Sequence, residues 1–246
     1  MTADFAEFPG RGDELPLTLI VFAFNEAENV PVVLPEILAW LRARRGGYQL
    51  VFVDDGSKDA TRERALAVCN GDANCTVISH ERNRGIGAAL KSGVRAATQP
   101  WISFLPCDGQ IPVREIGTLT DAAVRDRVRV VFSVYRARDD GFHRKVLSAG
   151  VRGLIFTVHG VRMRSDGPYL FRRELFDPDV LVPDTFFLNF EFPIRMLRAR
   201  ERYATETIEC VPRIAGHSKS TGWKRIAGVG RDLLDLRWRL LRERLR

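Results

Sequence analysis

The feature that most limits the possible folds of this chain is a repeated alternation of strand-like and helix-like segments. Nearly continuous apolar runs lie at residues 17–24, 48–53, 75–79 and 101–106, and each ends abruptly in polar residues. Strands that alternate with helices predict a parallel sheet with helices on both faces. Uninterrupted apolar runs predict strands that are covered on both sides. We therefore predict an α/β fold with a Rossmann-like, mostly parallel central sheet.

The same pattern continues after residue 110 and indicates one folded domain at residues 17–220. A long helix at 144–159 is expected to lie across the sheet. The other helices are expected at 27–44 (closed by Gly46 and Gly47), 61–69, 87–98, 112–125 and 186–200, and further strands at 128–134, 170–173 and 205–212.

The two ends of the chain differ from this domain. Residues 1–16 are polar and contain glycine and proline, so we expect a flexible leader. Residues 221–246 are predicted to form a basic amphipathic C-terminal helix, because residues 222–246 hold eight Lys or Arg against three acids. Its apolar stripe has alternating spacings of three and four residues, at Ile226, Val229, Leu233, Leu236 and Leu240.

Composition favours a globular protein with anionic partners. The 246 residues are 45% hydrophobic and 28% charged, and the net charge is +7, which suits nucleotides, phosphates or an acidic membrane surface. The four cysteines have no metal-finger spacing, so we expect a reduced, cytoplasmic chain without a secretory signal. The longest apolar segment, 146–161, is interrupted by Arg152 and His159 and falls short of the about 20 residues of a membrane span.

Polar residues follow each of the first four predicted strands. Because parallel strands end at the same edge of a sheet, these residues are expected to converge on one site. Asp108 and Gln110, two residues apart, offer oxygen ligands that suit Mg²⁺ or Mn²⁺, although Pro106, Asp108 and Gly109 are also ordinary turn residues. The convergent sets are Asn25–Glu26, Asp54–Ser57, Asn83–Gly87 and Asp108–Gln110.

Taken together, these motifs resemble those of the family 2 glycosyltransferases, which have the nucleotide-sugar-binding fold called GT-A. Within that family, the chain is most similar to the polyprenyl-phosphate sugar synthases of the dolichol-phosphate mannose synthase type. The segment Arg213-Ile214-Ala215-Gly216-His217-Ser218-Lys219 matches an Arg-x-x-Gly-x-Ser-Lys signature near the end of that catalytic domain. The resemblance covers roughly residues 17–220.

The resemblance implies a role for each matching residue. Asp108 and Gln110 would hold the metal, and Asp108, Asp166, Arg213 and Lys219 would be catalytic. Arg136, Arg144, Ser148 and Ser218 would contact the acceptor phosphate. The nucleotide sugar would be bound by Phe24, Asn25, Glu26, Asp54, Asp55, Gly56, Ser57, Asn83, Gly85, Gly87 and Lys91.

The sequence departs from the family pattern at two positions. The family usually has Asp-x-Asp after the fourth strand, and Pro106 stands at the first Asp here, which predicts weaker metal binding. Ala23 replaces a frequent proline before the aromatic-Asn-Glu motif.

Several of these residues also have a purely structural interpretation. Asp54–Ser57 could be a turn with a helix N-cap, and Gly85 and Gly87 could simply permit close packing. Glu191 could be a buried acid with satisfied hydrogen bonds, Cys107 a small packing residue, and the C-terminal helix an element docked on its own domain. The histidines have no metal-ligand spacing.

The implied activity is an inverting transfer of hexose from GDP-mannose or UDP-glucose to a polyprenyl phosphate at the cytosolic membrane face. An anionic phosphate acceptor needs no protein base, whereas a hydroxyl acceptor of a soluble glycosyltransferase would need Asp166 or Glu191. A third alternative is a nucleotide- or nucleic-acid-binding protein without catalysis. Few aromatic residues interleave with the basic ones, so nucleic acid is not expected as a partner.

Overall fold

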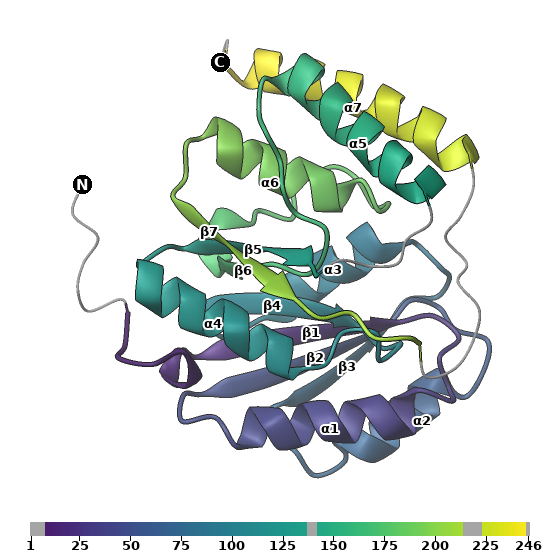
Figure 1. The fold of residues 1–246 in the computed structure, drawn as a ribbon. Helices are drawn as coiled ribbons and strands as arrows, with labels where there is room; N and C mark the ends of the chain where they lie inside the picture. The colour runs from purple at the N-terminus through teal and green to yellow at the C-terminus, as the bar shows by residue number, and fades with distance from the viewer. Residues whose placement is uncertain (1–7, 137–141, 214–222, 245–246) are drawn as a thin grey trace.

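The computed structural model describes residues 8–136, 142–213 and 223–244 and contains one seven-stranded sheet (Figure 1). Its strand order is β3-β2-β1-β4-β6-β5-β7, and every neighbouring pair is parallel except the two made by β6. The predicted α/β fold with a mostly parallel sheet is therefore confirmed. The strands are β1 (Leu17–Ala23), β2 (Tyr48–Asp54), β3 (Cys75–Ser79), β4 (Trp101–Pro106), β5 (Val130–Tyr135), β6 (Leu170–Arg172) and β7 (Tyr203–Ile208).

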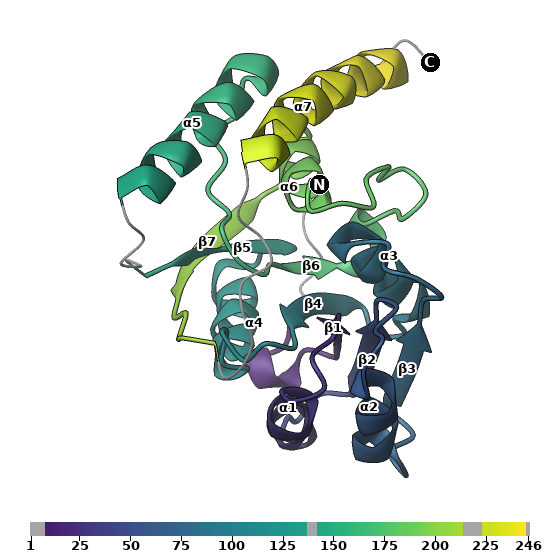
Figure 2. The same cartoon turned by 90° about the vertical axis from the view of Figure 1, so that its right-hand side faces the viewer.

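Helices cover both faces of the sheet, and a further pair forms an outer layer (Figures 1 and 2). Helices α1, α2 and α4 pack on one face, and α3 and α6 pack on the other. Helices α5 and α7 lie side by side beyond α6. The helices are α1 (Val30–Arg42), α2 (Thr61–Cys69), α3 (Ile86–Ala96), α4 (Arg114–Asp126), α5 (Phe142–His159), α6 (Leu188–Arg198) and α7 (Trp223–Arg244).

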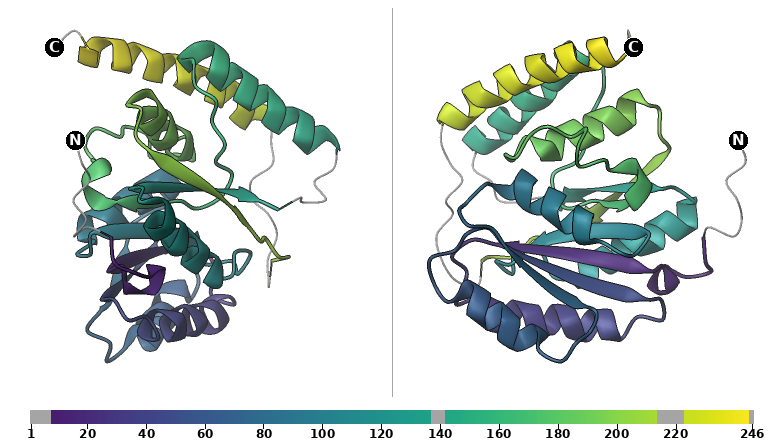
Figure 3. Two further views of the ribbon diagram at one scale, coloured as in Figure 1. Left: turned by 60° about the vertical axis from the view of Figure 1, so that its left-hand side comes forward. Right: turned by 180° about the vertical axis from the view of Figure 1, so that it is seen from behind.

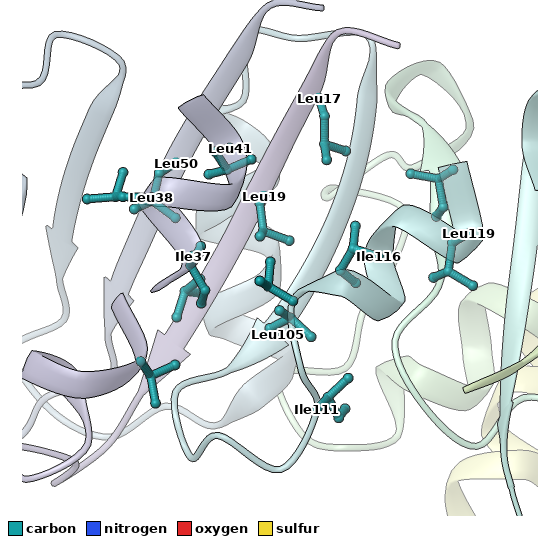
Figure 4. Close-up of a cluster of buried hydrophobic side chains, with 14 of the residues drawn as sticks. Leu17, Leu19, Ile37, Leu38, Leu41, Leu50, Leu105, Ile111, Ile116 and Leu119 are labelled. Atoms are coloured by element: carbon teal, nitrogen blue, oxygen red, sulfur yellow. The ribbon is translucent and has the colours of Figure 1, made fainter. Parts of the chain in front are cut away.

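The alternation of side chains along β1 explains why its apolar run is almost continuous. Leu17, Leu19 and Val21 are fully buried in the core under α1 and α4, as Figure 4 shows for the two leucines. Ile20 points to the opposite core, under α3 and α6. Because the side chains of a strand alternate between faces, a strand that is covered on both sides must be apolar at nearly every position.

The observed helices are shorter than predicted at several ends. Helix α1 begins at Val30, because residues 26–29 form a turn, and its C-cap is Ala43. The predicted C-cap glycines serve another purpose: a side chain at Gly46 would collide with the backbone of Glu14. The predicted bounds of α2, β3 and β4 agree with the observed ones, and the other predicted elements differ by one to four residues at their ends.

The second half of the predicted leader packs against the domain. Residues Gly12–Glu14 form one turn of 3₁₀ helix, a side chain at Gly12 would collide with α4, and Leu15 is fully buried. The predicted leader is therefore too long, because its residues from about Gly12 onward belong to the packed body.

Helix α5 does not lie across the sheet, because α6 separates the two (Figure 3). Ile155 of α5 and Ile194 of α6 share a small core with Leu233 and Leu236, which come from the predicted apolar stripe of α7. The carboxylate of Glu191 in α6 is fully buried and receives two hydrogen bonds of 2.7 Å from Arg239 and one of 2.9 Å from Arg195. The structural interpretation of Glu191 is the correct one.

Two further observations bear on the composition. Cys69 and Cys75, which flank the turn between α2 and β3, form a disulfide, so the expectation of four reduced cysteines was wrong. A spacing of six residues carries no recognised motif, and the fold alone brings the two residues together. Within the described ranges, no helix combines the length and apolarity that crossing a bilayer requires.

Candidate functional site

The loops that follow β1, β2, β3 and β4 meet at the carboxyl edge of the sheet. The strand order reverses at β1, since the chain runs outward through β2 and β3 and then returns to β4 on the other side. Opposite Ala23, the last residue of β1, lies Asp54 of β2, and Phe22 is paired with Pro106 of β4. Open α/β sheets bind ligands in the crevice at such a reversal.

Two carboxylates and one guanidinium meet in this crevice. Arg213 Nη2 lies 2.9 Å from Asp108 Oδ2, and Nη1 lies 3.6 Å from Glu26 Oε1. The Asp108 side chain is 7% exposed and that of Glu26 is 15% exposed. Sequence reasoning named all three residues, but only the fold shows that they form one cluster.

Backbone hydrogen bonds place Arg213 and Asp108. The Val211 N–H donates to Gln110 O at 2.8 Å, which ties the segment after β7 to the turn after β4. The Gln110 N–H donates to Asp108 Oδ1 at 3.0 Å, so this stretch is a turn, and the metal-binding role of Asp108 and Gln110 stays a prediction. Burial, with the negative charges of Glu26 and Asp108, raises the pKa of the neighbouring Cys107 thiol to about 12.

Asn25 and Ser57 shape the loops that carry the carboxylates. Asn25 has a φ of 53°, in the left-handed region that asparagine tolerates better than most residues. Its N–H donates to Ser57 Oγ and its Oδ1 accepts from the Lys58 N–H, both at 2.8 Å. The Ser57 N–H donates to Asp54 Oδ1 at 3.0 Å. These polar atoms therefore hold the first two loops together.

The carboxylate of Asp55 organises the loop after β3. It accepts hydrogen bonds from the backbone N–H groups of Arg84 at 2.9 Å and Gly85 at 2.8 Å. His80 Nδ1 contacts the same carboxylate at 2.7 Å, and His80 Nε2 contacts Ser92 Oγ at 2.9 Å. In this structure the Asp55 carboxylate therefore holds the loop after β3, and its predicted contact with the nucleotide sugar stays a prediction.

Sequence reasoning assigned no role to His80 beyond the end of a strand. Its side chain is 7% exposed, and it links Asp55 to helix α3. A histidine directly after a strand that ends beside an Asp-Asp motif is a signal that could have revealed this contact.

Glycines allow the loops to approach one another closely. Gly56 has a φ of +74°, and a side chain there would collide with the backbone of Arg82. Side chains at Gly85 and Gly87 would collide with the backbone of Asp184 and Thr185. Close packing therefore explains Gly85 and Gly87, and their packing partner is the loop before α6.

Lys91, which is predicted to bind the nucleotide sugar, is paired in this structure with the loop before α6. Its Nζ lies 2.5 Å from Asp184 Oδ1 and donates to the backbone oxygens of Val182 at 3.1 Å and Leu181 at 3.3 Å. Burial opposes ionisation of Asp184, but Lys91 and Arg84 together hold the pKa of that carboxyl below its usual value. The ammonium thus fixes the loop before α6.

The remaining predicted residues lie around the crevice or outside the described residues. Asp166 lies in the segment before β6. Its N–H donates to Ser133 O of β5, two strands from β4, at 2.8 Å, and its Oδ1 accepts from Arg152 at 3.1 Å. Arg136 is exposed and lies 3.6 Å from Glu209. Phe24 is half-buried and Asn83 exposed. Ser218, Lys219 and the side chains of Arg144 and Ser148 lie outside what the structure describes.

The residues at the crevice fit a metal that arrives with its substrate. Asp108 and Gln110 supply a carboxylate and a carboxamide, both hard oxygen donors. Among the described residues, no group of three His, Cys, Asp or Glu side chains could hold a metal ion. Mg²⁺ is commonly held by one or two carboxylates together with substrate phosphates and water, so the pair agrees with that mode and not with a closed protein cage.

A doubly wound sheet with charged side chains at its reversal point defines the chain as an α/β protein that binds its ligand at the carboxyl edge. Residues 18–190 match the sequence model of Glycosyl transferase family 2, and the chain belongs to this family. The resemblance seen in the motifs is thereby confirmed.

Three curated relatives carry names that refer to lipid phosphates. A dolichyl-phosphate beta-glucosyltransferase of Trichomonas vaginalis is 30% identical over 172 residues, which are 64% of this chain and 53% of the relative. An undecaprenyl-phosphate 4-deoxy-4-formamido-L-arabinose transferase of Aeromonas hydrophila is 29% identical, covering 65% and 50%. The human dolichyl-phosphate beta-glucosyltransferase is 27% identical, covering 64% and 55%. The chain spans about half the length of these relatives.

Solved structures confirm the fold. Glucosyl-3-phosphoglycerate synthase of Mycobacterium tuberculosis, in complex with Mn²⁺, UDP and phosphoglyceric acid, superposes with a TM-score of 0.68. The match covers 92% of this chain and 77% of that one at 18% identity. The same enzyme was also solved with Mg²⁺ and UDP, with a TM-score of 0.67 and 17% identity. The GT-A fold expected from the motifs is therefore present.

Proposed function

We propose that this chain transfers a hexose from a nucleoside diphosphate sugar to a polyprenyl phosphate, with inversion at the anomeric carbon and with the help of Mg²⁺ or Mn²⁺. The observation that carries the proposal is the cluster of Glu26, Asp108 and Arg213 at the reversal point of the sheet. The names of the curated relatives supply the acceptor class.

The proposed chemistry assigns a task to each charged residue of the crevice. Glu26 and Asp54 accept hydrogen bonds from the base and ribose, and Arg213 donates charge-assisted hydrogen bonds to the diphosphate. Asp108 and Gln110 would hold the metal, which, when bound, makes the nucleoside diphosphate a better leaving group. The acceptor phosphate is already anionic near neutral pH, so its oxygen can attack without a protein base. A single in-line displacement then inverts the configuration.

UDP-glucose is the first donor to test, with GDP-mannose second. Two of the three relatives described above are named as glucosyltransferases, and the structural neighbour was solved with UDP. Transfer assays with the two donors decide between them.

We further propose that the outer face of α7 rests on an anionic membrane surface on the cytosolic side. Leu234, Trp238 and Leu241 are 56%, 65% and 38% exposed and recur at helical spacing, apart from the buried stripe. Exposed Arg231 and Arg242 lie on the same helix. Arginine beside tryptophan and leucine suits the interface of an anionic bilayer.

The alternative acceptor is a hydroxyl group, which requires a base. Glu191 cannot serve, because it is fully buried and paired with two arginines. Asp166 is the remaining candidate, and its carboxylate is paired with Arg152 at 3.1 Å. The names of the curated relatives favour the phosphate acceptor over the hydroxyl.

Incubation with radiolabelled UDP-glucose or GDP-mannose, with and without polyprenyl phosphate and Mn²⁺, tests the proposal after organic extraction. We expect label in the organic phase only when the lipid phosphate is present. Label that stays aqueous with both donors, or that is transferred equally well without the lipid, would refute the proposed acceptor. Trp238→Ser should lower cosedimentation with anionic vesicles and leave donor hydrolysis unchanged.

A further inference from the structure

The guanidinium of Arg213 occupies the space where the two carboxylates of the crevice meet. It contacts Asp108 at 2.9 Å and Glu26 at 3.6 Å, and the Arg213 side chain is only 24% exposed. A positive charge between two partly buried carboxylates compensates their mutual repulsion and their loss of hydration. The crevice therefore contains a cation supplied by the chain itself.

This cation competes with a metal ion for the same oxygen atoms. Asp108 Oδ1 accepts the Gln110 N–H at 3.0 Å, and Oδ2 is taken by Arg213. Pro106, which stands at the end of β4, offers no second carboxylate from this turn. A divalent ion at Asp108 must then displace Arg213 or share the Asp108 carboxylate with it. Two cations on one carboxylate repel each other strongly.

A diphosphate would resolve this competition. Its oxygens offer the guanidinium a new partner, because arginine binds phosphate through paired charge-assisted hydrogen bonds. The backbone near Arg213 is anchored by the hydrogen bond from Val211 to Gln110. The side chain can therefore turn from Asp108 towards a bound phosphate while the main chain stays in place.

We infer that Arg213 is a resident counter-ion that keeps metal off Asp108 until the nucleoside diphosphate arrives. The inference rests on the proposed function and adds an order of binding to it: metal binds weakly to the empty protein and tightly with the nucleotide. Because coupling between two ligands is reciprocal, metal also strengthens nucleotide binding by the same factor. Removing the guanidinium should weaken this coupling.

Mn²⁺ binding measured by electron paramagnetic resonance, without and with UDP or GDP, tests the inference on the full chain. Arg213→Gln should bind Mn²⁺ about tenfold more tightly than the wild type when no nucleotide is present. Arg213→Lys keeps the charge and should stay near the wild type. Arg95→Gln removes the same charge from an exposed pair with Asp179 and should also leave the affinity unchanged, which controls for overall charge.

The outcomes separate this inference from the proposed function. Equal or weaker Mn²⁺ binding by nucleotide-free Arg213→Gln, in a protein that still binds Mn²⁺ with UDP or GDP, would overturn the counter-ion role alone. If the wild type binds no Mn²⁺ with either nucleotide, the proposed donor chemistry fails and the inference fails with it. A larger coupling factor between nucleotide and Mn²⁺ in the wild type than in Arg213→Gln would support both.

Discussion

Replacing Glu191 by alanine should destabilise the protein by about 3–5 kcal/mol, because the change leaves two partly buried guanidinium groups without their shared carboxylate. The Glu191 side chain is 0% exposed, and those of Arg195 and Arg239 are 12% and 20% exposed. For a chain of this size, such a loss lowers Tm by about 10 °C. Urea unfolding followed by circular dichroism measures the change in the free energy of unfolding.

Glu243→Ala is the matched control, since Glu243 also pairs with Arg195 but is 46% exposed. A half-exposed pair contributes at most about 1 kcal/mol, so the two variants should differ by several-fold. The same experiment separates structure from catalysis. If Glu191→Ala kept the wild-type stability and lost only activity, Glu191 would be a catalytic base and the assignment made here would be wrong.

Three further predictions concern other contacts. His80→Ala should raise KM for the donor about tenfold with little change in kcat, because one hydrogen bond to the Asp55 carboxylate is lost; an unchanged KM in steady-state kinetics would show that His80 does not position the site. Burial is the main cause that lowers the pKa of His159, and the charges of Arg198 and Arg237 act in the same direction, whereas its hydrogen bond to Leu233 O opposes the shift. Because the folded state lowers the pKa of His159, the unfolded state binds more protons, and the free energy of unfolding should fall as the pH drops below about 6.5. His159→Gln should therefore reduce the difference between the urea midpoints at low and neutral pH. An undiminished difference would assign the effect to other groups. Cys107, with its pKa near 12, should resist iodoacetamide at neutral pH while half-exposed Cys210 reacts, and mass spectrometry of the native protein should find one labelled site and not two.

The sheet could be predicted because its signal lies in single segments. The residues of β1 alternate between two buried faces, so burial alone demanded an apolar run at Leu17–Ala23. The site edge followed from the same pattern, since each of the first four strands is followed by a polar segment and parallel strands end at one edge. The ends of helices were harder to place, because residues 26–29 form a turn whose hydrogen bonds come from distant loops, such as Thr61 Oγ1 accepting from the Glu26 N–H.

The tasks of individual site residues depended on contacts between distant segments. Asp54 and Asp55 are neighbours in the sequence, yet the carboxylate of Asp55 is contacted by His80, Arg84 and Gly85, whereas that of Asp54 accepts from the Ser57 N–H. Lys91 lies in the predicted helix, but its partners are the backbone oxygens of a loop 90 residues further on. Neither arrangement leaves a local pattern, because the interacting residues are brought together only by the packed fold.

The central claim, that the crevice at Asp108 moves sugar from a nucleotide to a lipid phosphate, is tested most directly by one measurement. Radioactivity is counted in the organic phase after incubation of UDP-glucose and polyprenyl phosphate with the wild type and with Asp108→Asn, compared at equal folded concentration. We expect lipid-bound label with the wild type and a loss of at least about a hundredfold with the variant, since charge stabilisation at one such group contributes several kcal/mol. Equal label in both samples would contradict the account.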